Sequence, residues 1–305
     1  MEFLYVLEKF RIPGLNELML LITHLGEETA FLVIALIVFW CVDKRRGYYV
    51  MAVGFATTIF NQFIKLLCRV PRPWVLDENF TIVEQARAEA TGYSFPSGHT
   101  QTAVGTFGAL ACTEERRWAR RLFVAVAVLV PFSRMYLGVH TPSDVMTGAA
   151  ISLGLVVALR PMAQRELGRG MTDILGALAV MAAGLWLFVR LYPFPEEVDA
   201  GNLESGVKNA AALLGCLVGM LIVYPVEKRW IRFETKAVWW AQILKVVLGL
   251  GMVLLVKEGL RTPLEALLPV YVARSLRYFL VVLAAGILWP MSFGWFSRMG
   301  RKSSE

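Results

Sequence analysis

Long apolar runs separated by short charged segments make up most of the chain. An α-helix rises about 1.5 Å per residue, so crossing a bilayer core of about 30 Å takes roughly 20 apolar residues. The runs therefore predict an all-α, polytopic transmembrane bundle of nine spans, with eight or ten as alternatives. The predicted spans cover residues 29–42, 48–68, 97–112, 120–135, 143–159, 171–191, 207–224, 237–256 and 275–296.

The first 28 residues depart from this pattern. Pro13 and Gly14 interrupt them, and the apolar stretch from Leu15 to Leu25 is too short to cross a bilayer. We expect residues 1–28 to form an amphipathic interfacial or re-entrant segment. We expect no cleavable signal peptide, because no basic n-region and no small-residue cleavage site precede Glu27.

Composition supports a membrane protein over a soluble one. Hydrophobic residues make up 57% of the chain and charged residues 18%, against about 25% charged in an average soluble domain. The formal net charge is +7, but the basic residues are spread between apolar runs, which favours loops at a membrane surface over a nucleic-acid partner. The four cysteines have no paired spacing and predict neither a disulfide framework nor a zinc site.

Basic residues gather in five clusters between or after the predicted spans. If the spans alternate, all five clusters face one side, which the positive-inside rule identifies as the cytoplasm. The acidic residues Glu196, Glu197, Asp199 and Glu204 then face the other side. The basic clusters are Lys44, Arg45 and Arg46; Arg116, Arg117, Arg120 and Arg121; Arg160, Arg165 and Arg169; Lys228, Arg229, Arg232 and Lys236; and Arg298, Arg301 and Lys302.

Three polar stretches stand at or near the ends of predicted spans: residues 65–73, residues 96–99, and residues 133–134 with 140–144. The chain crosses the membrane twice between His99 and His140, so both imidazoles are predicted on the same, non-cytoplasmic face. All three stretches reach that face. Ionisable residues at membrane depth are costly and are functional candidates for that reason.

The residue types in these stretches suit phosphoryl transfer. A phosphate ester spreads negative charge over three equatorial oxygens in its transition state, and Lys65, Arg72 and Arg134 can supply the opposite charge. Ser97 and Gly98 stand at a predicted helix start, where free backbone N–H groups form an anion site. With no carboxylate cluster for a two-metal site, we expect no metal and no other cofactor.

The two histidines suit opposite ends of an in-line displacement, one as nucleophile and one as acid to the leaving oxygen. Asp144 follows His140 by four residues and can orient its ring. Each stretch also has a simpler interpretation. The sequence from Thr141 to Asp144 is a good helix start, Pro96-Ser97-Gly98 is an ordinary loop-to-helix junction, and Lys65 can extend to the membrane interface. The ordered combination favours a shared site over these separate explanations.

For other polar and small residues the sequence gives weaker evidence of a functional role. We expect His24 to be an interfacial side chain and Lys245 to be a structural residue within reach of the cytoplasmic interface. Gly215 and Gly219 form a G-x-x-x-G pair that favours close helix packing. The outer loop 74–95 is predicted either to cover the site or merely to connect two spans.

Taken together, Lys65 with Arg72-Pro73, then Pro96-Ser97-Gly98-His99, then Ser133-Arg134 with His140 and Asp144 resemble the three-part signature of the type-2 phosphatidic acid phosphatase superfamily, which also includes the vanadium haloperoxidases. The resemblance covers roughly residues 29–160, and the membrane-bound members of this family are lipid phosphatases. A looser likeness, at residues 25–28 and 40–47, is to the branch acting on sphingosine phosphates and dolichyl diphosphate.

The resemblance implies a role for each matching residue. His140 would attack phosphorus and form a phosphohistidine, oriented by Asp144. His99 would protonate the leaving oxygen and then activate water. The phosphate would be held by Lys65, Arg72, Ser97, Gly98 and Arg134.

We therefore expect a metal-independent membrane phosphatase acting on a lipid phosphate monoester or diphosphate at the non-cytoplasmic face, most simply in a bacterial plasma membrane, with a eukaryotic endomembrane as the alternative. A lipid flippase, a phosphotransferase and a haloperoxidase-like enzyme are rival functions for the same pocket. The expected organisation is an N-terminal segment 1–28, a phosphatase core 29–165 and a C-terminal transmembrane extension 171–305 without a chemical motif. Its expected partners are the lipid substrate, the bilayer and a second copy of the chain.

Overall fold

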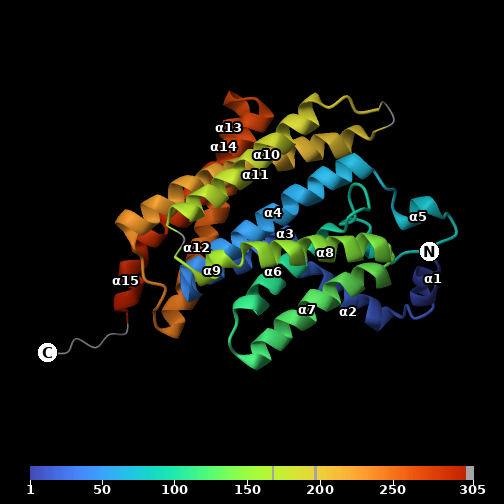
Figure 1. Ribbon diagram of the computed structural model, residues 1–305, viewed down its shortest axis with the longest axis horizontal. Coiled ribbons are helices and arrows are strands. Elements are labelled where there is room, and N and C mark those ends of the chain that lie inside the picture. The colour runs from blue at the N-terminus through green and yellow to red at the C-terminus, as the bar shows by residue number, and fades with distance from the viewer. Residues whose placement is uncertain (167, 196–197, 300–305) are drawn as a thin grey trace. The chain divides into compact units, whose positions relative to one another are not determined.

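The computed structural model describes residues 1–166, 168–195 and 198–299, which are predominantly helical and contain no β-strand (Figure 1). Glu196, Glu197, Arg301 and Lys302, which enter the charge argument above, lie outside these residues. Two compact units can be distinguished. The first contains residues 1–32, 49–164 and 198–203, and the second contains residues 33–48, 165–195 and 204–299.

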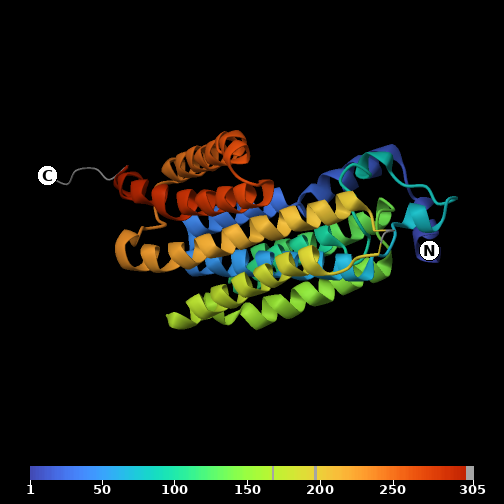
Figure 2. The ribbon, with the colours of Figure 1, turned by 90° about the horizontal axis from the view of Figure 1, so that it is seen from above.

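The first unit contains the three polar stretches. Three of its helices, α6, α7 and α8, pack against one another, and in both views the green helices of residues 98–159 lie side by side (Figures 1 and 2). The helices α1 and α2 also contact α7. The elements from the N-terminus onward are α1 (Glu2–Glu8), α2 (Pro13–His24), α3 (Glu28–Ile37), η1 (Val38–Val42), α4 (Lys44–Cys68), α5 (Pro73–Leu76), η2 (Glu84–Ala86), α6 (Gly98–Thr113), α7 (Arg117–Tyr136), α8 (Pro142–Leu159) and α9 (Pro161–Gln164), with η1 and the ends of α3 and α4 belonging to the second unit.

The second unit is built mainly from the C-terminal helices. A Cβ atom at Gly215 would lie 2.1 Å from the carbonyl oxygen of Ser275, and one at Gly219 would lie 2.9 Å from Val282. The G-x-x-x-G pair thus brings α11 and α14 into backbone contact, which supports the packing role expected from the sequence. The elements are α10 (Arg169–Leu191), α11 (Ala200–Val226), η3 (Glu227–Ile231), α12 (Trp239–Gly259), α13 (Arg261–Leu267), α14 (Val270–Leu283), η4 (Ala284–Leu288), η5 (Pro290–Ser292) and α15 (Phe293–Arg298).

The structure confirms an all-α membrane protein but does not confirm nine spans. Six helical segments among the described residues are long and apolar enough to cross a bilayer, or seven if the pair Pro13–His24 and Glu28–Val42, bent by 54°, forms one span. The predicted spans at 97–112 and 120–135 correspond to α6 and α7, which do not meet these criteria. The helix α6 has only 16 residues, and α7 begins with a charged turn.

Helix starts in the first unit follow from the sequence. Ser97 caps α6, its side chain accepting from the Thr100 N–H. Thr141 caps α8 in a reciprocal capping box with Asp144, and Pro142 occupies the first turn. The two helices then pack closely at Gly148, where a Cβ atom would lie 3.1 Å from the Ser97 carbonyl oxygen. This contact fixes the start of α6 against α8.

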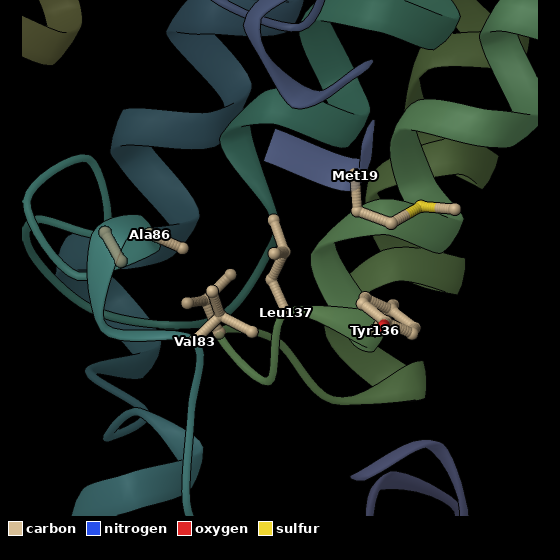
Figure 3. Close-up of a cluster of buried hydrophobic side chains, with 7 residues drawn as sticks. Met19, Val83, Ala86, Tyr136 and Leu137 are labelled. Carbon is tan, nitrogen blue, oxygen red and sulfur yellow. The ribbon is translucent and has the colours of Figure 1, made fainter. Parts of the chain in front are cut away.

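A buried hydrophobic cluster anchors the outer loop of residues 74–95. Val83 and Ala86 from the loop pack with Met19 of α2 and with Tyr136 and Leu137 at the end of α7 (Figure 3). The Val83 N–H also donates to the Leu137 carbonyl over 3.1 Å. The loop is therefore held beside the segment that leads to His140.

Candidate active site

His140 lies in the short connection between α7 and α8 and is 1% exposed. Its Nδ1 is 3.4 Å from Asp144 Oδ2 and 3.3 Å from Ser94 Oγ, and Ser94 itself donates to Asp144 over 2.6 Å. Its Nε2 is 2.9 Å from Arg72 NH1, which can only donate. These partners favour the neutral tautomer with the proton on Nδ1 and the lone pair on Nε2.

Electrostatics reinforce the neutral state of His140. Burial is the main cause that holds the pKa of this imidazole well below its usual value, and the positive charges of Arg72, Arg134 and Lys65 lower it further. A neutral imidazole keeps its lone pair, which a nucleophile requires. The group can therefore act as a nucleophile at neutral pH.

Arg72 is held almost entirely by backbone carbonyls. Its Nε donates to Gly92 over 3.0 Å, its NH2 to Thr91 over 2.7 Å and its NH1 to Val139 over 3.0 Å. Two of these carbonyls come from the outer loop. The guanidinium therefore stands at a fixed position beside His140 Nε2.

Lys65 and Arg134 complete the cationic group but differ in how far their donors are used. Lys65 Nζ donates to the Tyr93 carbonyl over 2.6 Å. Arg134 is fully buried, its NH1 donates to Thr23 Oγ1 over 2.9 Å, and its Nε and NH2 have no hydrogen-bond partner. Buried donors without a partner are rare because they lose their hydration without compensation. Arg134 thus offers the N–H groups of two nitrogens, Nε and NH2, to an anion.

Ser97 and Gly98 begin α6, as the sequence predicts. Ser97 is fully buried and its N–H donates to the Asp144 carbonyl over 3.1 Å, which joins this helix start to the segment that carries His140. A Cβ atom at Gly98 would lie 3.6 Å from Asn61 Oδ1, an ordinary contact. Protein packing therefore does not require glycine here, and the missing side chain leaves the backbone open to close approach.

His99 faces a carboxylate that the sequence analysis did not single out. Its Nε2 lies 3.7 Å from Glu89 Oε2, and neither atom has a hydrogen-bond partner. The charges of Arg134, Lys65 and Arg72 act on His99, and the charge of His99 acts on His140. All eight candidate residues are thus brought together within the first unit. The eight are Lys65, Arg72, Ser97, Gly98, His99, Arg134, His140 and Asp144.

The N-terminal segment also reaches this site. A Cβ atom at Gly26 would lie 2.9 Å from the His99 carbonyl oxygen, so only glycine permits this approach. His24 pairs with Glu27 and lies 3.3 Å from Glu89, and the donor atoms of these three residues lie within 4.8 Å of one another. Among the described residues, these three have ligand atoms close enough together to hold one metal ion. The His24 side chain is half-exposed.

Sequence reasoning missed several residues of the site. Ser94, Glu89 and the carbonyls of the outer loop contact the predicted residues, but their own sequence carries no motif. Asn61, which donates to the Pro96 carbonyl over 3.1 Å, was also missed. Its signal was present: an amide one turn before Lys65 on the same helix, buried in the structure.

The arrangement combines a buried neutral imidazole, a carboxylate that orients it, three cations and a second imidazole. Such a set can bind a tetrahedral oxyanion and exchange a group at its centre. Two family models match the chain. The first, for the PAP2 superfamily, matches residues 46–167, which include all eight candidate residues. The second, for the transmembrane extension of PAP2 superfamily phosphatases, matches residues 208–301.

Curated relatives agree with both models. Phosphatidylglycerophosphatase B of Bacillus subtilis is 30% identical over 159 residues, which are 48% of this chain and 73% of the relative. The chain belongs to the PAP2 superfamily. Its resemblance to the type-2 phosphatidic acid phosphatases is confirmed, and it is a multi-pass membrane phosphatase of that superfamily.

Two further relatives are also named as phosphatases. Phosphatidylglycerophosphatase B of Escherichia coli K12 is 37% identical, with 42% of this chain and 67% of the relative covered. An undecaprenyl-diphosphatase of Sulfolobus acidocaldarius is 29% identical, with 45% and 66% covered. No solved structure matches the chain significantly.

Proposed function

We propose that this PAP2 chain hydrolyses a lipid phosphate monoester or lipid diphosphate through a phosphohistidine on His140, without a metal ion. The observation that carries the proposal is the hydrogen bonding of His140. Its Nδ1 faces Asp144 and its Nε2 faces Arg72. An imidazole held in this tautomer directs its lone pair toward the cationic group, where a phosphate would bind.

In the first half of the proposed reaction, His140 Nε2 attacks phosphorus and the bond to the leaving lipid oxygen breaks. His99, protonated once the negative charge of the bound phosphate offsets the surrounding cations, gives that oxygen its proton, and Asp144 stabilises the positive ring of His140. In the second half His99 takes a proton from water, the water oxygen attacks phosphorus, and the P–N bond breaks. Inorganic phosphate leaves and His140 is restored.

The phosphate oxygens would be bound by Lys65, Arg72, Arg134 and the N–H groups at Ser97 and Gly98. Arg134 supports this role most directly, since its Nε and NH2 are buried without partners. The planar fork of a guanidinium matches two phosphate oxygens at once. Arg72 already stands next to the attacking nitrogen, so it can bind an equatorial oxygen as that nitrogen approaches phosphorus.

We place the reaction on the non-cytoplasmic face, because the positive-inside rule assigns the basic clusters to the other side. The lipid would enter from the bilayer with its headgroup directed to the cations. A bacterial plasma membrane is the proposed location, supported by the bacterial origin of the two phosphatidylglycerophosphatase relatives. The names of the relatives favour phosphatidylglycerophosphate and undecaprenyl diphosphate as the first substrates to test.

The test is phosphate release by the detergent-purified chain in the presence of a chelator. The substrates are phosphatidylglycerophosphate, phosphatidate, undecaprenyl diphosphate and sphingosine 1-phosphate. We expect turnover of at least one lipid, inhibition by vanadate, and loss of turnover in His140→Ala. Ser143→Ala, which changes a side chain beside Asp144 at the start of α8, is the matched control and should stay active.

A strict metal requirement, or full activity in His140→Ala, would refute this mechanism. Turnover that depends on a sugar or lipid acceptor would identify a phosphotransferase instead. Lipid movement across vesicles at an unchanged rate in His140→Ala, without phosphate release, would identify a flippase.

A further inference from the structure

The second unit contains a polar cavity of about 580 Å³ that the proposed reaction does not use. It is lined at the start of α4, near the start of α10, and along η3 with the chain that follows it. Six of its lining side chains are basic and four are acidic. The basic ones are Lys44, Arg45, Arg165, Lys228, Arg232 and Lys236, and the acidic ones are Asp43, Glu166, Glu227 and Glu234.

Charge pairing inside the cavity is incomplete. Lys44 pairs with the nearly buried Glu227 over 2.5 Å and lies over the Phe233 ring at 4.7 Å. Within the described residues, none of the other five basic side chains has a carboxylate within 4.0 Å. The cavity thus keeps two more cations than carboxylates, and five of its cations form no ion pair in the part of the chain that the structure describes. Arg232 Nε donates to the Lys228 carbonyl and the Lys228 ammonium lies over the Tyr224 ring, and both keep further N–H groups for an anion.

An independent feature of the same cavity is the hydroxyl of Tyr48. Tyr48 lines the cavity, is 2% exposed, and its Oη has no hydrogen-bond partner. Its neighbour Tyr224 differs, because its hydroxyl donates to the Gly168 carbonyl over 3.2 Å. A buried hydroxyl without a partner is unfavourable unless a ligand or water pairs with it. Tyr48 therefore marks a donor that the protein itself leaves unused.

We propose that this cavity is a second ligand site, which binds a phosphate monoester group. Guanidinium and ammonium donors together with a tyrosine O–H suit the oxygens of a compact dianion. A volume of about 580 Å³ accommodates a phosphate with a small polar headgroup but not the acyl chains of a lipid. The carboxylates of Glu166 and Glu234 would accept from hydroxyl groups on such a headgroup.

The ligand phosphate has two sources, an anionic lipid headgroup or a free phosphate. The basic clusters that supply the lining are those assigned to the cytoplasmic side by the positive-inside rule. Anionic lipids of that leaflet and cytosolic phosphate esters both reach such a site. The site would give the C-terminal extension a binding role that is separate from hydrolysis.

The test uses the full chain carrying His140→Ala, purified in detergent. Binding of dihexanoyl phosphatidate is measured by calorimetry, and hydrogen exchange of residues 227–238 reports occupancy of this cavity independently of the site around His140. We expect saturable binding with protection of residues 227–238. The double variant Lys228→Gln/Arg232→Gln should bind at least about tenfold more weakly at this site, and Tyr48→Phe about threefold more weakly.

The matched control is Arg229→Gln, which neutralises a neighbouring cation that does not line the cavity. This variant should bind dihexanoyl phosphatidate, and show hydrogen-exchange protection of residues 227–238, to the same extent as the parent chain. Protection that is equal in the double variant and in the control would overturn the proposal. So would equal binding of dihexanoyl phosphatidylcholine, because its headgroup carries no net charge.

Inorganic phosphate and glycerol 3-phosphate separate the two sources. Protection of residues 227–238 by either soluble ion identifies the phosphate group itself as the ligand. Protection by dihexanoyl phosphatidate alone identifies a lipid headgroup. No protection by any of the three overturns the proposal. These outcomes do not depend on turnover, so they are distinct from a failure of the proposed hydrolysis.

Discussion

Each unit contains a fully buried cation, and the two differ in how their donors are satisfied. Lys245 in the second unit donates to the carbonyls of Trp40 and Thr235 over 3.2 and 3.0 Å, and its ammonium lies 4.4 Å from the Phe293 ring centre. Arg134 in the first unit uses only NH1, for Thr23, and keeps two donors without partners. Burial of charge alone therefore does not identify a site. Unused donors add to the case at Arg134, because they occur beside His99, His140 and the other cations of the candidate site.

The strongest test of this comparison is to remove each cation. Arg134→Ala should reduce kcat/KM on a lipid phosphate by about 10²- to 10³-fold, the usual loss for a donor aimed at transition-state charge. Arg134→Lys should restore only part of it, because an ammonium cannot bind two oxygens as a guanidinium does. Equal rates for the wild type and Arg134→Ala in a phosphate-release assay would contradict the assignment.

Lys245 should show the opposite behaviour. Lys245→Ala removes the ammonium and the buried alkyl chain, so we expect it to cost about 2–4 kcal/mol of stability. The folded fraction should keep its specific activity. Lys245→Met is the matched control, since it keeps most of the buried chain and should lose less. Melting temperature in detergent measures the stability, and an inactive but fully folded Lys245→Met would show that Lys245 has a functional role.

Glu89 places a negative charge beside the cations of the first unit, and its removal tests whether that charge affects the choice of substrate. Its carboxylate lies 3.7 Å from His99 Nε2, on the side where the leaving oxygen would depart. Glu89→Gln keeps the shape and removes the charge. Because repulsion of an anionic leaving group is then lost, we expect kcat/KM for a lipid diphosphate to rise several-fold relative to a monoester. A steady-state comparison of the two substrates measures this ratio, and an unchanged ratio would exclude a role in selection.

The smallest expected effect concerns pH. Because its pKa is lowered, the His140 imidazole stays neutral at pH values where a free histidine would be protonated. The acidic limb of kcat/KM assigned to His140 should therefore lie below pH 6.5. Asp144→Asn removes a negative charge that favours the protonated ring. The limb should therefore move further to acid, by less than about one unit, alongside the loss of rate. A pH–rate profile of both proteins decides this, and a shift to alkaline pH would contradict it.

The structure brings together the eight polar residues that the sequence singled out, and these residues come in short local motifs. Ser97 and Thr141 act as helix caps, and such caps depend on neighbours within four residues. The loop residues that contact the site, Glu89 and Ser94, could not be predicted. Glu89 and Ser94 lie in a loop without periodicity, and they reach His99 and Asp144 only through tertiary packing.

Hydropathy alone leaves two points of the fold open. Lys245 was expected to be a structural residue within reach of the cytoplasmic interface, and its burial and its bonds to the carbonyls of Trp40 and Thr235 support the structural role. The predicted spans at α6 and α7 are not confirmed by length and composition. The helix α7 packs against α6 but still exposes apolar side chains at Leu122, Val124 and Val128.

The backbone bonds of Arg72 constrain how this protein can vary. Because main-chain carbonyls at Thr91, Gly92 and Val139 hold the guanidinium, the side chains at those positions can be exchanged without removing any of its partners. The number of residues between Arg72 and Thr91 has no such freedom. An insertion or deletion there would shift two of the three acceptors at once. Natural variants should therefore differ in the amino-acid sequence of this loop far more than in its length.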